Sequence, residues 1–378
     1  MGARVRAIRG AARRSADGLD RLGRYAGAGA ADLPEQGRSE GLCREIRHPR
    51  ARSRDSAQEA EAAGLRRQFP VKGVRAAFLA ALLCAGGCVA QPSDPSSPPI
   101  ERAGISVGSI ERARAQLVDI EKRSGGRLGV ALIDPAGEVL LSHRGEERFA
   151  MCSTFKTLLA GMVLSGETGL EQEDRLTIDP AEVEGHAPFT RSRFEEGWMT
   201  VGDAAQNIVT VSDNGAANLL LDEVGGPRGL TEWIRALGDD VTRLDRRELA
   251  LNENAADDPR DTTSPLAFGE TYRRVLSDDT VLDASGRERL AQWLEASETG
   301  LNRLRAGMPG DWRVGDKTGY CAAPGAVEIN DVAIFDPAGG GWYTLVFFLD
   351  RPREAGAFAD ALGAEVGAIA ADLVGSTS

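Results

Sequence analysis

A hydroxyl and an amine stand three positions apart in the stretch Ser153-Thr154-Phe155-Lys156, at the start of an apolar run typical of a helix. Positions three apart share one helix face, so Ser153 Oγ and the Lys156 amine can meet. Serine becomes a nucleophile when an adjacent base takes its proton, and the N–H groups at a helix start favour a developing negative charge. The spacing indicates acyl transfer by serine, although the same short pattern also occurs by chance with Ser153 as a helix cap.

Lysine is rare in this chain, which makes each lysine informative. Of the 45 lysines and arginines, only four are lysines: Lys72, Lys122, Lys156 and Lys317. Arginine stays protonated in proteins, whereas a buried lysine can lose its proton and act as a base. Lys156 is therefore a candidate base for Ser153.

Two further triplets could take part in the same chemistry. Ser212-Asp213-Asn214 joins two predicted helices, where it is either a simple cap or a source of a hydroxyl for proton transfer and an amide for substrate binding. Lys317-Thr318-Gly319 lies late in a predicted strand. Its lysine and threonine can hold an anion, and we expect the glycine to leave room for a ligand along the strand edge.

The charge of the 378-residue chain is unevenly distributed. The net charge is −12, yet the first 70 residues contain 15 arginines and only nine acidic residues. The rest of the chain is therefore strongly acidic and offers no basic face for nucleic acid. We expect no nucleic-acid partner.

Residues 71–88 have the form of a secretory signal, with a positive start, a short apolar centre and small residues before Cys88. Residues 1–70 are then either translated upstream sequence or a disordered leader. The signal resembles that of a lipoprotein, which would anchor Cys88 to lipid, but ordinary cleavage after Ala90 remains an alternative. Residues 89–105 read as a polar tether. We expect an exported, periplasmic protein, either lipid-anchored or free.

The periodicity of the remaining chain predicts an α/β (α+β) catalytic domain over residues 106–378. Strands are expected near both chain ends and helices between them, which favours a mainly antiparallel five-stranded sheet flanked by terminal helices, with a helical subdomain inserted over about 150–295. The predicted strands are 128–134, 138–143, 312–319, 328–335 and 342–349. The predicted helices are 109–122, 153–165, 200–211, 215–224, 228–237, 265–276, 284–297 and 355–374.

In this order, the three motifs resemble the signature of penicillin-recognising acyl-transfer enzymes. With Arg246-Arg-Glu-Leu-Ala-Leu-Asn252 and the Arg-Asp-Thr-Thr that follows, the chain from about 109 to 374 resembles the class A serine β-lactamases. The resemblance implies a helical domain packed on an α/β domain with the active site between them. It implies hydrolysis of the β-lactam amide of penicillins and cephalosporins through a serine acyl-enzyme, and resistance to these antibiotics.

Catalytic roles follow from the matched positions. Ser153 resembles the nucleophile, Lys156 its partner, and Ser212 the hydroxyl that protonates the leaving nitrogen. Glu248 and Asn252 resemble the pair that positions and activates the hydrolytic water. Either Lys156 or Glu248 could be the base for acylation, and the sequence leaves this open.

Substrate contacts are implied in the same way. Asn214 resembles an amide contact, and the backbone N–H groups of the nucleophile and Tyr320 would bind the oxyanion. Lys317, Thr318 and Gly319 resemble the element that receives the substrate carboxylate. Tyr320 departs from the small residue usual at its position.

Three further positions match parts of the family site. Arg303 stands where some members hold a second cation for the substrate carboxylate, and otherwise it is a surface arginine. Arg246 and Asp261 resemble the ion pair that pins the Glu248 loop. His186 matches a residue at the mouth of the site, its alternative being an ordinary loop residue.

Cys152 and Cys321 are the cysteines of the body: Cys152 directly precedes the nucleophile, and Cys321 comes two residues after Lys-Thr-Gly. Export exposes them to an oxidising compartment, so we predict a disulfide beside the site, with two buried free thiols as the alternative. This pair resembles the carbapenem-hydrolysing members, which adds carbapenems to the expected substrates.

Two other functional classes share some of these motifs. A penicillin-binding carboxypeptidase or transpeptidase, or a non-catalytic β-lactam sensor, would acylate without rapid turnover. Glu248 with Asn252 argues against both. His143 and His186 lie in no metal-ligand spacing, so we expect no metal and no cofactor, and a monomer acting on a small-molecule β-lactam.

Overall fold

The computed structural model describes residues 105–375 apart from 254 and 324–325. The leader, the signal, Cys88 and nearly all of the tether lie outside the described residues. In the described part, no helix combines the length and apolarity needed to cross a membrane.

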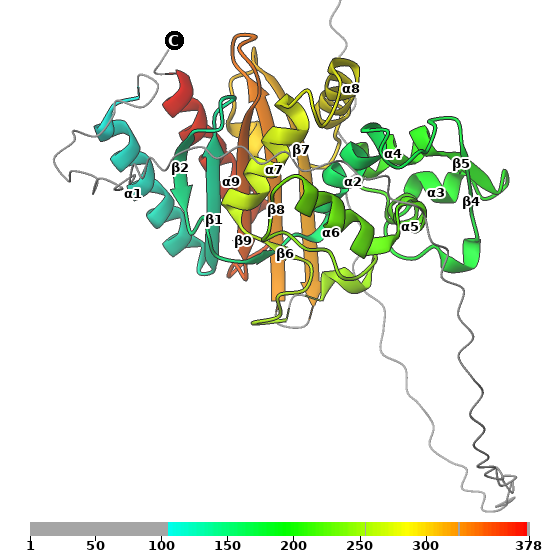
Figure 1. Ribbon diagram of the computed structural model, residues 1–378. Coiled ribbons are helices and arrows are strands. Elements are labelled where there is room, and N and C mark those ends of the chain that lie inside the picture. The colour runs from blue at the N-terminus through cyan, green and yellow to red at the C-terminus, as the bar shows by residue number, and fades with distance from the viewer. Residues whose placement is uncertain (1–104, 254, 324–325, 376–378) are drawn as a thin grey trace, which may run out of the picture. The chain divides into compact units, whose positions relative to one another are not determined.

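A five-stranded antiparallel sheet forms the centre of the domain (Figure 1). Its strand order is β2-β1-β9-β8-β7, so strands from both ends of the chain lie side by side. The strands are β1 (Arg127–Ile133), β2 (Val139–His143), β7 (Arg313–Ala323), β8 (Ala326–Asp336) and β9 (Tyr343–Asp350). The predicted sheet is confirmed, and β7 extends four residues beyond the predicted end, to the far side of Cys321.

The two terminal helices cover one face of this sheet (Figure 1). They are α1 (Val107–Ser124) and α9 (Ala357–Gly375). Leu117 of α1 and Leu362 of α9 pack with Leu345 of β9 in one buried cluster. Alternation along the strands places the other set of side chains, such as Val346, on the opposite face.

The opposite face packs against helices from the middle of the chain. The helices are α2 (Phe155–Leu164), α3 (Pro188–Ser192), α4 (Val201–Thr210), α5 (Asn214–Glu223), α6 (Gly226–Ala236), α7 (Pro265–Ser277) and α8 (Ala284–Glu295). Of these, α2 is buried on nearly every side, because residues 155–163 are all buried. A helix that is buried on all sides belongs to a protein core. The residues packed around α2 therefore hold its first turn firmly in place.

Short elements complete the domain. They are β3 (Phe149–Ala150) with β6 (Thr262–Thr263), β4 (Arg175–Thr177) with β5 (Trp198–Thr200), and the 3-10 segments η1 (Cys152–Thr154), η2 (Pro180–Glu182), η3 (Ala250–Asn252) and η4 (Leu304–Gly307). Neither α3 nor these strand pairs were predicted from the sequence, since segments of two to five residues are too short to show a period. It also placed Ser153 inside the α-helix, whereas the structure has it in η1, just before α2.

Candidate active site

Ser153 lies in a tight turn that is fixed on both sides. Cys152 has a φ of 48° and is joined by a disulfide to Cys321 of β7, with a Cα–Cα distance of 5.6 Å. Thr154 donates from its N–H and its hydroxyl to the Met151 carbonyl, at 3.2 and 2.8 Å. The predicted disulfide is thus confirmed, and it ties the serine turn to the strand that forms the opposite wall of the site.

Lys156 is fully buried beneath this turn. Its Nζ donates to Ser153 Oγ at 3.1 Å. Three further acceptors surround the same nitrogen, namely Asn214 Oδ1 at 2.6 Å, Glu248 Oε1 at 2.9 Å and the Ser212 carbonyl at 3.0 Å. These acceptors suit an ammonium group, which has three protons to donate.

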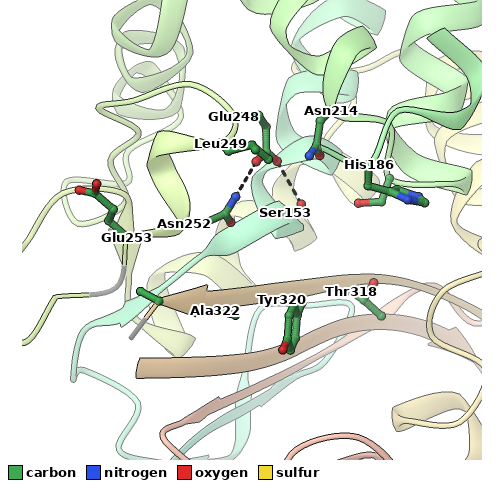
Figure 2. A pocket seen from close by; sticks show the side chains of 12 residues that line it. Ser153, His186, Asn214, Glu248, Leu249, Asn252, Glu253, Thr318, Tyr320 and Ala322 are labelled. Atoms are coloured by element: carbon green, nitrogen blue, oxygen red, sulfur yellow. Dashed lines mark hydrogen bonds between the residues drawn. The ribbon is translucent and has the colours of Figure 1, made fainter. Parts of the chain in front are cut away.

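The Glu248 carboxylate meets the nucleophile directly. Its Oε1 accepts from Ser153 Oγ at 3.1 Å, and its Oε2 accepts from Asn252 Nδ2 at 2.8 Å (Figure 2). Burial alone would raise the pKa of Glu248, but the charge of Lys156 and the hydrogen bonds from Lys156, Asn252 and Ser153 hold it below its usual range. An ionised carboxylate therefore stands beside the hydroxyl.

Helix α5 positions both charged partners of Ser153. Asn214 and Asn218 are four residues apart and share one face of the helix. Asn214 Oδ1 accepts from Lys156 Nζ. The side-chain amide of Asn218 accepts from the Glu248 backbone N–H at 3.1 Å and donates to the Glu248 backbone carbonyl at 2.8 Å. Sequence reasoning missed Asn218, although its spacing from Asn214 was a usable signal.

The start of α5 is anchored by Asp213, another residue whose role was missed. Its buried carboxylate caps the helix by accepting from Ala216 N at 2.9 Å. It also accepts from the N–H groups of Phe189 and Thr190 at 2.9 and 3.0 Å. The turn that presents Ser212, whose φ is 60°, is therefore held rigidly against α3.

Lys317, which the resemblance assigns to the substrate carboxylate, lies beneath the cleft and not among its lining residues. It is fully buried, and its Nζ donates to Ser212 Oγ at 3.0 Å and to the Thr318 carbonyl at 2.7 Å. Burial and the nearby charge of Lys156 lower the pKa of Lys317 to about 7. Thr318 is the member of this element that lines the cleft. Lys317 thus contacts, from beneath, two of the residues that line the cleft, Ser212 and Thr318.

Gly319 leaves room for a different neighbour than we predicted. A Cβ on Gly319 would lie 2.8 Å from the Met151 carbonyl oxygen and 3.1 Å from Thr154 Cγ2. Its missing side chain therefore faces the serine turn and not the ligand. The glycine allows β7 to approach that turn closely, which is also what the disulfide requires.

Arg303 does not line the cleft. Its Nε donates to Asp360 Oδ1 on α9 at 2.7 Å, and its Nη1 donates to the Asn330 carbonyl at 2.8 Å. A Cβ on Gly363 of α9 would contact the Arg303 side chain, so Arg303 lies at the face of the sheet that α9 covers. Its guanidinium is bound by Asp360 and the Asn330 carbonyl there. The structure thus does not bring Arg303 to the site as the second cation.

Arg246 pins the Glu248 loop, as the resemblance implied. Its Nε contacts Asp261 Oδ2 at 2.5 Å, and its Nη1 contacts Glu253 Oε2 at 2.7 Å. Asp261 also accepts from the Arg246 N–H at 2.9 Å. Asn252 Oδ1 lies 3.3 Å from Cys321 Sγ, so the loop also touches the disulfide.

A cleft of about 590 Å³ opens above these groups (Figure 2). His186 is exposed at its edge and donates from Nε2 to the Val211 carbonyl at 3.0 Å. The lining residues are Ser153, His186, Ser212, Asn214, Glu248, Leu249, Asn252, Glu253, Thr318, Tyr320, Ala322 and Ala323. Leu249, Glu253, Ala322 and Ala323 were not assigned from the sequence.

The described residues contain no cluster of three or more His, Cys, Asp or Glu side chains able to hold a metal ion. The cleft instead contains a serine with an ionised carboxylate on one side and a buried ammonium on the other. This arrangement suits nucleophilic acyl transfer followed by hydrolysis.

Comparison with known proteins agrees with this chemistry. A family model described as the beta-lactamase enzyme family matches residues 111–374. Beta-lactamase L2 of Stenotrophomonas maltophilia is 42% identical over 266 residues, which cover 70% of this chain and 86% of the relative. The carbapenem-hydrolyzing beta-lactamase KPC of Klebsiella oxytoca is 37% identical over 278 residues, which cover 72% and 93%.

Solved structures show the same relationship. The structure of an ancestral class A beta-lactamase matches with a TM-score of 0.65 and 44% identity, covering 69% of this chain and 99% of that chain. A beta-lactamase from Xanthomonas campestris matches with a TM-score of 0.66 and 38% identity, covering 70% and 98%. With the family model matched over most of the described domain, the chain belongs to the class A serine β-lactamase family.

Proposed function

We propose that this protein hydrolyses β-lactam antibiotics through a serine acyl-enzyme in which Glu248 activates both the serine and the water. The observation that carries the proposal is the placement of Glu248, with one carboxylate oxygen 3.1 Å from Ser153 Oγ and the other held by Asn252. A penicillin-binding enzyme or a sensor would need a base only to activate the serine, and not to activate a hydrolytic water.

The hydrogen bonds around Lys156 favour Glu248 as the base for acylation. Lys156 Nζ is already surrounded by acceptors at Asn214, Ser212 and Glu248, which favour its protonated form. Glu248 is ionised and can accept the proton of Ser153 as its oxygen attacks the lactam carbonyl. Lys156 then stabilises the negative charge near the nucleophile.

The remaining steps use the other groups of the cleft. The backbone N–H groups of Ser153 and Tyr320 bind the oxyanion, and Ser212, which receives a hydrogen bond from Lys317, protonates the leaving nitrogen. Ser212 regains a proton from Lys317, and the proton that Glu248 took from Ser153 passes back into this network through Lys156, which leaves Glu248 ionised. Glu248 then takes a proton from the water that attacks the ester and returns it to the Ser153 oxygen as the ester bond breaks. Asn252 holds the carboxylate in place for that step.

The test compares Glu248→Ala with wild type after a pulse of benzylpenicillin. We expect Glu248→Ala to form the covalent adduct on Ser153 more slowly than wild type acylates, because the serine loses its base, and then to retain that adduct, because the acyl-enzyme loses the base for its hydrolysis; steady-state turnover should fall at least about 1000-fold. Intact-protein mass spectrometry detects the adduct, and Ser153→Ala, which should show neither adduct nor turnover, is the control. Wild-type turnover by Glu248→Ala would contradict the proposal.

We further propose carbapenems as substrates and an exported, monomeric enzyme. Support for the first comes from the Cys152–Cys321 disulfide and from the similarity to the carbapenem-hydrolyzing KPC enzyme. Support for export and for a lipid anchor at Cys88 comes from the signal-like residues 71–88. Imipenem hydrolysis tests the first proposal, and fractionation of cells expressing wild type and Cys88→Ala tests the anchor.

A further inference from the structure

The cleft has two chemically different ends. Thr318 and Ser212 mark one end, with the Lys317 amine beneath them. At the other end lie Glu253 and Leu249 of the Glu248 loop, which face the later part of β7. The described residues that line the cleft include two glutamates and neither lysine nor arginine.

The two glutamates differ in how their charge is balanced. Glu248 forms a buried pair with Lys156. The Glu253 side chain is 70% exposed and shares its partner, because Arg246 also binds the buried Asp261. One guanidinium thus pairs with two carboxylates, so Arg246, Asp261 and Glu253 together carry one surplus negative charge. Glu253 lies at the edge of the cleft, and Figure 2 shows it on the far side of Asn252 from Ser153, with its carboxylate directed away from the serine.

The same end is also apolar. Of the large apolar side chains in the described chain, only five are prominently exposed, and two of them, Leu249 and Tyr320, line this cleft. Leu249 lies on the backbone of Gly185, since a Cβ there would be 2.5 Å from Leu249 Cδ2. Ala322 and Ala323 add small side chains farther along β7. Apolar walls beside a carboxylate suit an aromatic group that is neutral or positively charged.

The orientation of a substrate follows from the two ends, given the function proposed above. Its carboxylate is attracted to the Lys317 end, and its lactam carbonyl must reach Ser153 Oγ. The acyl side chain on the opposite side of the lactam ring then extends toward Leu249, Tyr320 and Glu253. We propose that this enzyme selects β-lactams whose aromatic acyl side chain is neutral or cationic, and that Glu253 disfavours an anionic one.

Three penicillins that differ in one substituent test this selection. Benzylpenicillin is neutral at the side-chain α-carbon, ampicillin carries an amine there, and carbenicillin carries a carboxylate. We expect kcat/KM in the full-length enzyme to fall in the order ampicillin, benzylpenicillin, carbenicillin. The value for ampicillin should exceed that for carbenicillin about tenfold, because a partly exposed negative charge attracts the amine and repels the carboxylate.

The variant Glu253→Gln should reduce the ampicillin-to-carbenicillin ratio by about threefold or more, because the surplus charge is removed. Glu365→Gln is the matched control: Glu365 is likewise an exposed acid paired with an arginine, Arg123, but it lies on α9 away from the cleft. It makes the same change in net charge and should leave the ratio unchanged. In wild type, 0.5 M salt should lower the ratio, since exposed charges are screened.

The outcomes separate this inference from the function on which it rests. Absence of benzylpenicillin turnover by wild type would overturn the proposed function and this inference with it. If wild type hydrolyses benzylpenicillin efficiently but has equal kcat/KM for ampicillin and carbenicillin, the inference alone is overturned. The same holds if Glu253→Gln leaves the ampicillin-to-carbenicillin ratio unchanged. If Glu253→Gln does not fold, the salt dependence of the wild-type ratio decides, and a ratio insensitive to salt counts against the proposal.

Discussion

Ser153 owes its reactivity to two neighbours of opposite charge at equal distance. Lys156 Nζ and Glu248 Oε1 each lie 3.1 Å from its Oγ, and they are 2.9 Å from each other. Each charge offsets the cost of burying the other, so an ionised base can stand in an enclosed site. Lys317 is also fully buried, and burial together with the nearby charge of Lys156 lowers its pKa to about 7.

The lowered pKa of Lys317 predicts the alkaline limb of the pH profile. The amine is charged below its pKa of about 7 and neutral above it, so its attraction for a substrate carboxylate is lost as pH rises through that value. We expect kcat/KM for benzylpenicillin to fall above about pH 7, while Glu248 stays ionised throughout the neutral range.

Steady-state rates from pH 5 to 9 at constant ionic strength check this. In Lys317→Arg the cation cannot lose its proton, so the alkaline limb should be absent even if the overall rate is lower. A wild-type profile that stays level to pH 9 would show that Lys317 does not control binding.

At the scale of elements, β7 and the turn η1 must lie closer together than ordinary side chains allow. The disulfide joins them, and Gly319 provides the space for the Met151 carbonyl. Helix α5 performs the corresponding task on the other wall, where Asn214 and Asn218 hold Lys156 and the Glu248 backbone. The catalytic distances therefore depend on how these elements pack.

Gly319→Ala tests the close approach of β7. Its Cβ would meet backbone at 2.8 Å, so β7 and η1 must separate, which should lower the free energy of unfolding by about 1–3 kcal/mol. We expect kcat/KM to fall at least about tenfold, because Tyr320 N–H and Ser153 move apart. Urea denaturation and steady-state kinetics measure both effects.

Gly310→Ala, in the loop just before β7, is the control. No atom lies within 4 Å of its would-be Cβ, so stability and rate should stay close to wild type. If Gly319→Ala were equally silent, the close approach would have no importance for the reaction.

At the scale of the whole domain, the disulfide closes a loop of 169 residues that contains all the helices from α2 to α8. Both cysteines are fully buried, so the bond is shielded from solvent reductants in the folded protein. A cross-link over so long a loop constrains the unfolded chain strongly.

Removing the disulfide with Cys152→Ser/Cys321→Ser should lower the free energy of unfolding by up to about 5 kcal/mol in the chain-entropy model. Urea denaturation compares the double variant with wild type. Peptide mapping of unreduced wild-type protein should recover the peptides of Cys152 and Cys321 as one cross-linked species. Recovery of the two cysteines as separate, alkylated peptides would refute the bond.

Local pattern in the sequence determined the elements and the chemistry. Apolar runs and periodicity located the five strands of the sheet and most of the longer helices, because each of these segments has one or more buried faces. The motifs around Ser153, Ser212, Lys317 and Glu248 identified the reaction, since acyl transfer with hydrolysis needs these groups together. The disulfide was also predictable, because both cysteines adjoin motifs that must share one cleft.

Tertiary packing decided the direction in which each side chain points. Alternation along β7 directs Lys317 and Gly319 inward and Thr318 and Tyr320 to the cleft, a choice of face that depends on which side of the sheet meets η1. Arg303 matched a family position but is engaged by Asp360 and a backbone carbonyl. The spacing of Asn218 from Asn214 places both on one face of α5, but only the packing of the loop against that face brings Asn218 to the Glu248 backbone. Such contacts join residues far apart in sequence, so a local pattern does not identify the partner.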